Sequence, residues 1–158
     1  MKIKPRKNLG QNFLSDKNII KSIVEIGNIK KNHTIIEIGA GTGNLTEFIL
    51  KKKPKQVIVI EKDYNLAKLL YQKFNNKINI INEDILNIKI NTISKEKNIV
   101  YGNLPYNIST EILARLITDN EKFHSYKKLV LMFQKEVADR ILAKKNSKKY
   151  GRLSIISN

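Results

Sequence analysis

Cysteine is absent from the 158-residue sequence, and its absence excludes disulfide bonds, cysteine zinc sites and thiol catalysis. Only two histidines occur, His33 and His124, and they lie far apart without the spacing of metal ligands. No apolar run approaches the length of a membrane-spanning helix, and the basic start MKIKPRKNLGQNFL lacks the apolar segment of a secretory signal. We therefore expect a cytoplasmic protein that uses neither a metal nor a membrane.

Acidic residues are scarce relative to basic ones. The sequence has 14 Asp and Glu against 30 Lys and Arg, a formal net charge of +16, and the basic residues recur along the whole chain. A polyanionic partner is the direct interpretation. The alternative is drift toward AT-rich codons, which would make Lys, Asn and Ile all frequent and leave many lysines only solvating the surface. With 41% hydrophobic residues and no low-complexity stretch, the composition predicts one globular domain.

Short β-branched segments alternate with segments of helical periodicity. The first helix is predicted within SDKNIIKSIVEIGNI, with Ser15 or Asp16 as its N-cap. Strands that are nearly continuous in Ile and Val, between amphipathic helices, indicate a parallel sheet covered on both faces, a doubly wound α/β domain. For RLSIISN, at 152–158, strand and helix both remain open. The predicted strands are 34–39, 56–61, 78–82, 98–103 and 127–133, and the later helices are 43–52, 64–74, 108–118 and 134–145.

A glycine-rich loop, EIGAGTGN, follows the first strand. Ligands of doubly wound folds bind at the carboxyl ends of the strands. Gly39, Gly41 and Gly43 would let the backbone turn tightly and approach a ligand beside a helix N-terminus. The alternative is a tight turn with no ligand. Asn44 stands where the dinucleotide fingerprint needs its third Gly, and this argues against a pyrophosphate.

An acidic residue ends the second strand, and another follows the third. Glu61 comes 24 residues after Glu37, about where nucleoside-binding α/β folds place the acid that binds ribose hydroxyls. The alternative role for Glu61 is to cap the next helix. Asp84 could accept from the exocyclic amine of an adenine, or be an ordinary turn residue. Because the glycines and both acids fall at three successive strand ends, together they predict a pocket for a nucleoside.

The fourth strand runs into GNLPYNI. Asn103 and the backbone carbonyl of Leu104 offer hydrogen-bond acceptors, and Pro105 holds them rigid. Tyr106 offers an aromatic face on which a flat base can stack. A turn with a buried tyrosine is the better interpretation of this tetrapeptide alone. Beside a nucleoside pocket, a base-binding site is favoured.

Seven segments resemble, in order and spacing, those of the ribosomal RNA adenine N6-dimethyltransferases: LGQNFL, EIGAGTGNLT, VIEKD, EDIL, GNLPYNIST, FQKEVADRILA and YGRLS. The resemblance covers essentially the whole chain, and GNLPYNIST followed by QKEV is its most specific part. The chain is most similar to the small-subunit branch, which confers kasugamycin sensitivity. The macrolide-resistance methylases of large-subunit RNA usually have Ile at the position of Leu104 and lack QKEV.

The resemblance implies S-adenosylmethionine as the cofactor. Asn12 and Leu14 would close over it, and two glycines would approach its methionine part. Glu61 would hold the ribose, and Asp84 the adenine amine. The implied cofactor-binding residues are Asn12, Leu14, Gly39, Gly41, Glu61, Asp84 and Asn103.

The resemblance also implies N6,N6-dimethylation of adenines in small-subunit (16S) ribosomal RNA during ribosome assembly. The target adenine would lie against Asn103, Leu104, Pro105 and Tyr106, which are the expected catalytic residues. The expected partner is the small ribosomal subunit, and no oligomer is expected for a full-length family member.

The family normally continues past YGRLS with more sheet and a helical C-terminal domain. We therefore expect two parts: a basic arm at 1–14 with the cofactor-closing motif, and a methyltransferase domain at 15–158 that is incomplete at its C-terminus. Three other functions stay open: a non-catalytic RNA-binding or assembly module, a large-subunit rRNA methylase, and a DNA adenine methylase. A nicotinamide-dependent oxidoreductase is the weakest alternative, because of Asn44 and the lack of a hydride-handling acid or base.

Overall fold

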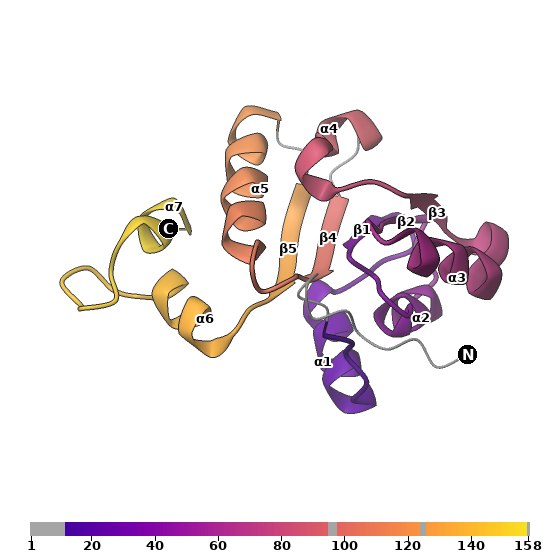
Figure 1. Cartoon of the computed structure of the whole chain (residues 1–158), viewed down its shortest axis with the longest axis horizontal. Helices are drawn as coiled ribbons and strands as arrows, with labels where there is room; N and C mark the ends of the chain where they lie inside the picture. The colour runs from indigo at the N-terminus through magenta and orange to yellow at the C-terminus, as the bar shows by residue number, and fades with distance from the viewer. Residues whose placement is uncertain (1–11, 95–97, 124–125, 158) are drawn as a thin grey trace.

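The computed structural model describes residues 12–94, 98–123 and 126–157. Its centre is a sheet of five parallel strands in the order β3-β2-β1-β4-β5 (Figure 1). The first strand, β1, lies in the middle of the sheet. The next two strands add on one side of it, and β4 and β5 add on the other side. The predicted doubly wound fold is confirmed, and no predicted strand end is wrong by more than one residue. The strands are β1 (Thr34–Ile38), β2 (Gln56–Ile60), β3 (Asn79–Ile81), β4 (Asn98–Asn103) and β5 (Tyr126–Met132).

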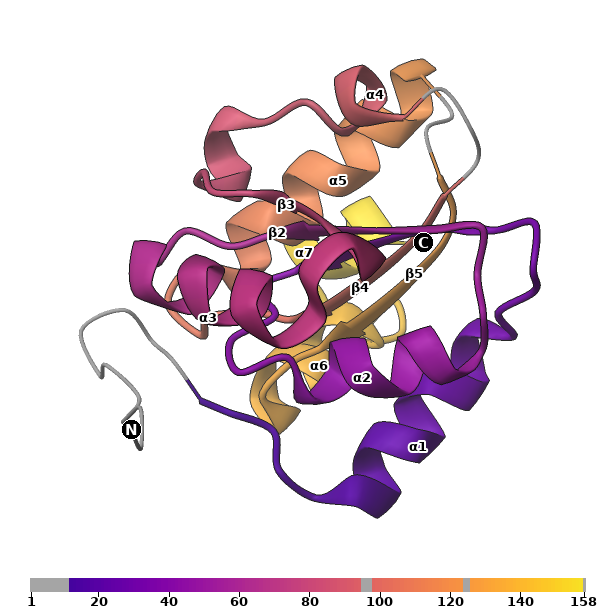
Figure 2. The same ribbon diagram turned by 90° about the vertical axis from the view of Figure 1, so that its right-hand side faces the viewer.

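Helices cover both faces of the sheet, which runs between them in Figure 2. Ile35 and Ile36, neighbours in β1, are both fully buried, but they belong to the two separate apolar clusters on opposite faces. Burial on both faces explains why the inner strands β1, β2 and β4 are mainly apolar instead of alternating between apolar and polar residues. The helices on one face are α1 (Lys17–Gly27), α2 (Asn44–Lys51) and α3 (Tyr64–Phe74), and those on the other are α4 (Ile90–Ile93) and α5 (Ser109–Phe123).

Aspartate side chains start two of these helices. Asp16 Oδ1 accepts from the backbone N–H groups of Asn18 (2.8 Å) and Ile19 (3.1 Å), so Asp16, and not Ser15, is the N-cap of α1. Asp63 caps α3 in the same way, through the N–H of Asn65 at 2.9 Å. The predicted bounds of α3 are confirmed at both ends.

A buried tyrosine fastens α1 to the sheet. Tyr101, in β4, is fully buried and its hydroxyl donates to the Val24 carbonyl at 3.0 Å. A Cβ at Gly27 would lie only 1.7 Å from the Tyr101 hydroxyl, so the helix can approach only with a glycine there. This contact holds the helix that follows residues 12–14.

The C-terminal segments form two short helices, α6 (Lys135–Ile141) and α7 (Arg152–Ser157). The helix predicted for 134–145 ends early, because Lys144, Lys145 and Asn146 form a polar turn in which Asn146 has a φ of 70°. The segment 152–158, left open between strand and helix, is helical as far as it is described. Its Ser154 hydroxyl is buried and donates to the Arg140 carbonyl at 2.6 Å, which ties α7 to α6.

Three short elements were not predicted: α4 and the 3-10 turns η2 (Asn75–Lys77) and η3 (Ile85–Asn87). Each is too short to show a helical period in the sequence. Within the described parts of the chain, no helix has the length and apolar character needed to cross a membrane.

Candidate functional site

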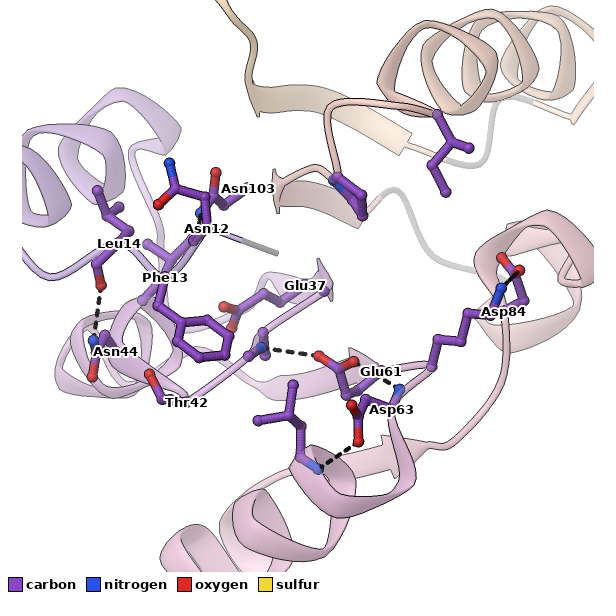
Figure 3. Close-up of a pocket in the computed structure, with 18 of the residues that line it drawn as sticks. Asn12, Phe13, Leu14, Glu37, Thr42, Asn44, Glu61, Asp63, Asp84 and Asn103 are labelled. Atoms are coloured by element: carbon purple, nitrogen blue, oxygen red, sulfur yellow. Dashed lines mark hydrogen bonds and ion pairs between the residues drawn. The ribbon is translucent and has the colours of Figure 1, made fainter. Parts of the chain in front are cut away.

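A pocket of about 320 Å³ lies at the carboxyl ends of the strands (Figure 3), and its volume is within the range of small-molecule sites. Figure 3 shows Asn12, Phe13 and Asn103 at one end, Glu61 and Asp63 further along, and Asp84 at the other end. Of the residues predicted to bind cofactor or target, the pocket is lined by Asn12, Leu14, Gly39, Gly41, Glu61, Asp84, Asn103 and Pro105. Leu104 and Tyr106 lie outside its lining.

The glycine-rich loop forms the floor beside α2. Gly39, Gly41 and Gly43 all have positive φ angles, 70°, 58° and 76°, which residues with side chains rarely adopt. A Cβ at Gly41 would also come within 3.0 Å of the Phe13 ring. The loop therefore needs its glycines both for its turn and for the close approach of residues 12–14.

Glu61 ties this loop to the end of β2. The side chain is buried; Oε2 accepts from the Gly41 N–H at 2.9 Å and Oε1 from the Asp63 N–H at 3.0 Å. Burial raises the pKa of Glu61 above its ordinary value, although these two hydrogen bonds oppose the shift. Since Asp63 caps α3, the alternative in which Glu61 caps that helix is wrong. Each carboxylate oxygen retains a further lone pair that a ligand hydroxyl can use.

Glu37 is a second buried acid of the pocket, and sequence reasoning did not assign it a role. It is 1% exposed, and its Oε2 finds no hydrogen-bond partner among the described residues. Burial raises the pKa of Glu37 to about 7, and the charge of Glu61 adds to the shift, while Thr46 and Lys73 oppose it. The signal available in the sequence was a carboxylate within a strand of β-branched residues.

Asp84 lies at the far end of the pocket. Its Oδ1 accepts from the Leu86 N–H at 3.0 Å and starts η3, and its Oδ2 lies 2.7 Å from the Lys62 ammonium. Partial burial favours a higher pKa for Asp84, but the bonds from Lys62 and Leu86 outweigh it and the pKa is lowered. Asp84 is thus a charged turn residue that also faces the pocket, so its two proposed roles do not exclude each other.

The NLPY turn follows β4. The Leu104 side chain is buried in the core, whereas Tyr106 is 41% exposed, so the alternative of a turn with a buried tyrosine is wrong. Asn103 donates from Nδ2 to the Asn12 carbonyl at 2.7 Å. Asn12 in turn donates from its own Nδ2 to the Tyr106 hydroxyl, also at 2.7 Å. The turn and the N-terminal segment are therefore joined at two points.

Residues 12–14 pass along the pocket wall. The Leu14 carbonyl accepts from Asn44 Nδ2 at 2.8 Å, which attaches the segment to the start of α2. Phe13, which sequence reasoning did not single out, lines the pocket next to the glycine loop. The rest of the basic arm at 1–11, and His124, lie outside the described residues. Among those described, no group of three or more His, Asp or Glu could hold a metal ion.

Solved structures with the same fold belong to one class of enzyme. A dimethyladenosine transferase from Plasmodium falciparum superposes with a TM-score of 0.75 and 32% identity, over 92% of this chain and 51% of that one. The 23S rRNA methyltransferase ErmE superposes with a TM-score of 0.74 and 27% identity, over 92% of this chain and 55% of that one. The fold is that of the S-adenosylmethionine-dependent methyltransferases.

Comparison of the sequence identifies the family within this class of enzyme. The chain belongs to the ribosomal RNA adenine dimethylase family, whose model matches residues 2–158. It is 54% identical over 158 residues to the ribosomal RNA small subunit methyltransferase A of Pelagibacter ubique. All of this chain is covered in that comparison but only 60% of the relative, so the chain spans about 60% of the relative's length. The family suggested by the sequence motifs is confirmed.

Proposed function

We propose that this chain is the cofactor-binding and target-binding part of an enzyme that transfers two methyl groups from S-adenosylmethionine to the N6 amine of adenines in small-subunit ribosomal RNA. One observation carries the proposal: Asp84, Glu61 and Asn103, from three different strand ends, line a single pocket. The family membership and the 54% identity to a small-subunit methyltransferase support the substrate. The division into an arm at 1–14 and a catalytic domain at 15–158, and a cytoplasmic location, are part of the proposal.

The pocket residues fit S-adenosylmethionine. A Cβ at Gly39 would meet only the Asn103 carbonyl, at 3.9 Å, so the glycine leaves open space at the pocket that a side chain would fill. Asp84 would accept from the adenine amine and Glu61 from the ribose hydroxyls. Residues 12–14, with Gly39 and Gly41, would hold the methionine part at the other end. The bound cofactor supplies an activated methyl group on a sulfonium.

The target adenine would bind at the NLPY turn. Its N6 amine is a poor nucleophile, because the lone pair is delocalised into the ring. Hydrogen bonds accepted by the Asn103 side-chain oxygen and the Leu104 carbonyl would draw the amine toward a tetrahedral shape and aim its lone pair. Such preorganised dipoles also favour the positive charge that develops on nitrogen. The exposed Tyr106 ring is available to stack on the base, a contact worth about 1–3 kcal/mol.

The charge of the chain suits an RNA partner. A formal net charge of +16 favours association with a polyanion at low salt, and the small ribosomal subunit is the partner we propose. The rate of association should fall with ionic strength, because exposed charges are screened within about 10 Å at 0.1 M salt. Metal ligands have no part in this mechanism.

The test is methyl transfer with radiolabelled S-adenosylmethionine, using unmethylated small subunits and, in parallel, large-subunit RNA. Digestion and chromatography should give dimethyladenosine from the small subunit alone. Product from large-subunit RNA would reverse the branch assignment. No product from either substrate, with cofactor binding intact by calorimetry, would favour a non-catalytic module. Repeating the assay with the C-terminal region of a relative joined to the chain would show whether the missing activity lies in that region.

A further inference from the structure

Asn12 connects two residues that lie more than 90 positions further along the chain. Its backbone carbonyl accepts from Asn103 Nδ2, and its side-chain Nδ2 donates to the Tyr106 hydroxyl, both at 2.7 Å. The two contacts use different groups of Asn12: the bond from Asn103 uses its backbone, and the bond to Tyr106 uses its side chain. The two ends of the NLPY turn are thus held by one residue of the N-terminal segment.

The same segment is also attached to the start of α2. The Leu14 carbonyl accepts from Asn44 Nδ2 at 2.8 Å, and the Phe13 ring lies against Gly41. Residues 12–14 therefore extend from the start of α2 to the turn after β4 and form part of the pocket wall (Figure 3). The pocket keeps a volume of about 320 Å³ with this segment in place. The segment is a wall of the pocket and not a plug.

The bond to Asn12 also fixes how the Asn103 amide is turned. A backbone carbonyl can only accept, so the atom of Asn103 that faces it must be the amide nitrogen. The amide oxygen then points away from Asn12, and among the described residues no hydrogen bond to it is found. This is the orientation in which Asn103 can accept from an amine. A reversed amide would offer that amine a donor.

We propose that Asn12 is a positioning residue, and that its bond to Tyr106 couples the wall of the cofactor pocket to the turn that binds the target base. The proposal rests on the proposed function for the identity of the two ligands. Loosening Asn12 from Tyr106 removes one of the two hydrogen bonds that join residues 12–14 to the NLPY turn and leaves only the bond from Asn103, so the segment is held less firmly there. Ligand binding must then order the segment, so affinity falls. In the same way, a ligand that orders residues 12–14 favours the orientation of the turn that accepts a base.

Calorimetric titration with S-adenosylhomocysteine tests the coupling without needing catalysis. Tyr106→Phe removes one oxygen that lies outside the pocket lining, and we expect it to weaken binding by about 2- to 5-fold, the effect of one hydrogen bond. Asn12→Ala should weaken binding at least as much, and adding Tyr106→Phe to it should have no further effect. Tyr71→Phe is the matched control, because Tyr71 is also exposed and should leave affinity unchanged. Unchanged affinity in Tyr106→Phe, or independent effects that multiply in the double variant, would overturn the proposal.

The side-chain amide signals of the ¹⁵N-labelled, ligand-free chain give a second readout. Tyr106→Phe should shift the NH2 signals of both Asn12 and Asn103, and Tyr71→Phe neither. Signals that do not move would overturn the coupling whether or not a cofactor binds. Shifted signals in a chain that fails to bind S-adenosylhomocysteine would instead refute the proposed function and keep the hydrogen-bonded link. The melting temperature should stay unchanged in Tyr106→Phe, because the side chain is exposed, so a loss of affinity cannot be ascribed to unfolding.

Discussion

Glu61 Oε2 lies 2.9 Å from the backbone nitrogen of Gly41 and accepts its hydrogen bond. The two residues belong to different strand ends: Glu61 follows β2, and Gly41 follows β1. The other oxygen of Glu61 accepts from the Asp63 N–H at 3.0 Å. A single buried carboxylate thus sets the relative position of two loops that line the pocket.

Glu61→Gln should therefore damage both stability and binding. Glutamine has one acceptor oxygen, so its NH2 group must face one of the two backbone N–H donors. We expect a loss of about 1–3 kcal/mol in the free energy of unfolding, measured by urea denaturation. Affinity for S-adenosylhomocysteine should fall about tenfold or more by calorimetry, because a hydrogen bond to a charged group is lost. Glu111→Gln, at an exposed position of α5, is the control and should change neither quantity.

The raised pKa of Glu37 predicts that the free energy of unfolding depends on pH. Its pKa is raised from 4.5 to about 7 in the folded chain, so between these two values the folded state binds more protons than the unfolded state. The contribution of Glu37 is therefore fully present below about pH 4.5 and is lost as the pH rises to about 7. Glu37→Gln removes this titration. Relative to that variant, the native chain should lose roughly 2–3 kcal/mol of unfolding free energy between pH 4.5 and pH 8.

Urea denaturation of both chains at about pH 4.5, 5, 6, 7 and 8 measures that difference. The other carboxylates are shared by the two proteins and cancel in the comparison. A difference that does not change with pH would show that Glu37 titrates normally, and hence that water or a cation reaches it.

Gly43→Ala should destabilise the fold at the start of α2. Gly43 has a φ of 76°, and a Cβ there would lie 2.5 Å from the Phe74 ring. Both effects act together, so we expect a loss of about 2–4 kcal/mol in the free energy of unfolding. Gly151→Ala is the matched control: a Cβ at Gly151 meets nothing within 4 Å, and its stability should differ little from that of the native chain. Equal urea midpoints for the two variants would contradict the strain assigned to Gly43.

The architecture could be predicted from the sequence, because strands buried on both faces appear as short apolar runs between amphipathic helices. The inner strands are short runs of mainly β-branched residues, and the helix at 64–74 shows its apolar period in the sequence. The short helix α4 escaped prediction, because four residues cannot show a period. After the early end of α6 comes a polar turn in which Asn146 has a positive φ, and the chain returns so that α7 is bonded to α6 through Ser154 and Arg140, a contact that no local pattern reveals.

The site was predictable as far as it depends on strand ends. Gly39, Glu61, Asp84 and Asn103 stand at the carboxyl ends of four successive strands, and topology alone brings them to one rim. The hydrogen bonds among them were not predictable, since they depend on side-chain directions. Two contacts illustrate this: Glu61 accepts from the Gly41 N–H and does not cap α3, and Asp84 pairs with Lys62.

Asp84→Ala should loosen the adenine end of the pocket. The substitution removes the carboxylate proposed to accept from the adenine amine, and we expect affinity for S-adenosylhomocysteine to fall about tenfold by calorimetry. Lys62→Met is the informative partner variant, because it breaks the ion pair but keeps the carboxylate and most of the side-chain length. Since Lys62 is largely exposed, its loss should leave affinity within a few fold. Equal losses in both variants would mean that the ion pair, and not the acceptor oxygen, matters.

The rate of methyl transfer should depend on Asn103. Asn103→Ala removes the side-chain acceptor for the target amine, and we expect the single-turnover rate of methyl transfer to fall about 100-fold or more. Cofactor affinity should stay within a few fold, because the other groups of the pocket remain. Asn103→Asp separates the two functions of the side chain: it keeps acceptor oxygens for the amine but loses the donor to the Asn12 carbonyl. We expect its rate to lie between those of the native chain and Asn103→Ala. An alanine variant that turns over at the native rate would exclude Asn103 from catalysis, whatever its position in the pocket.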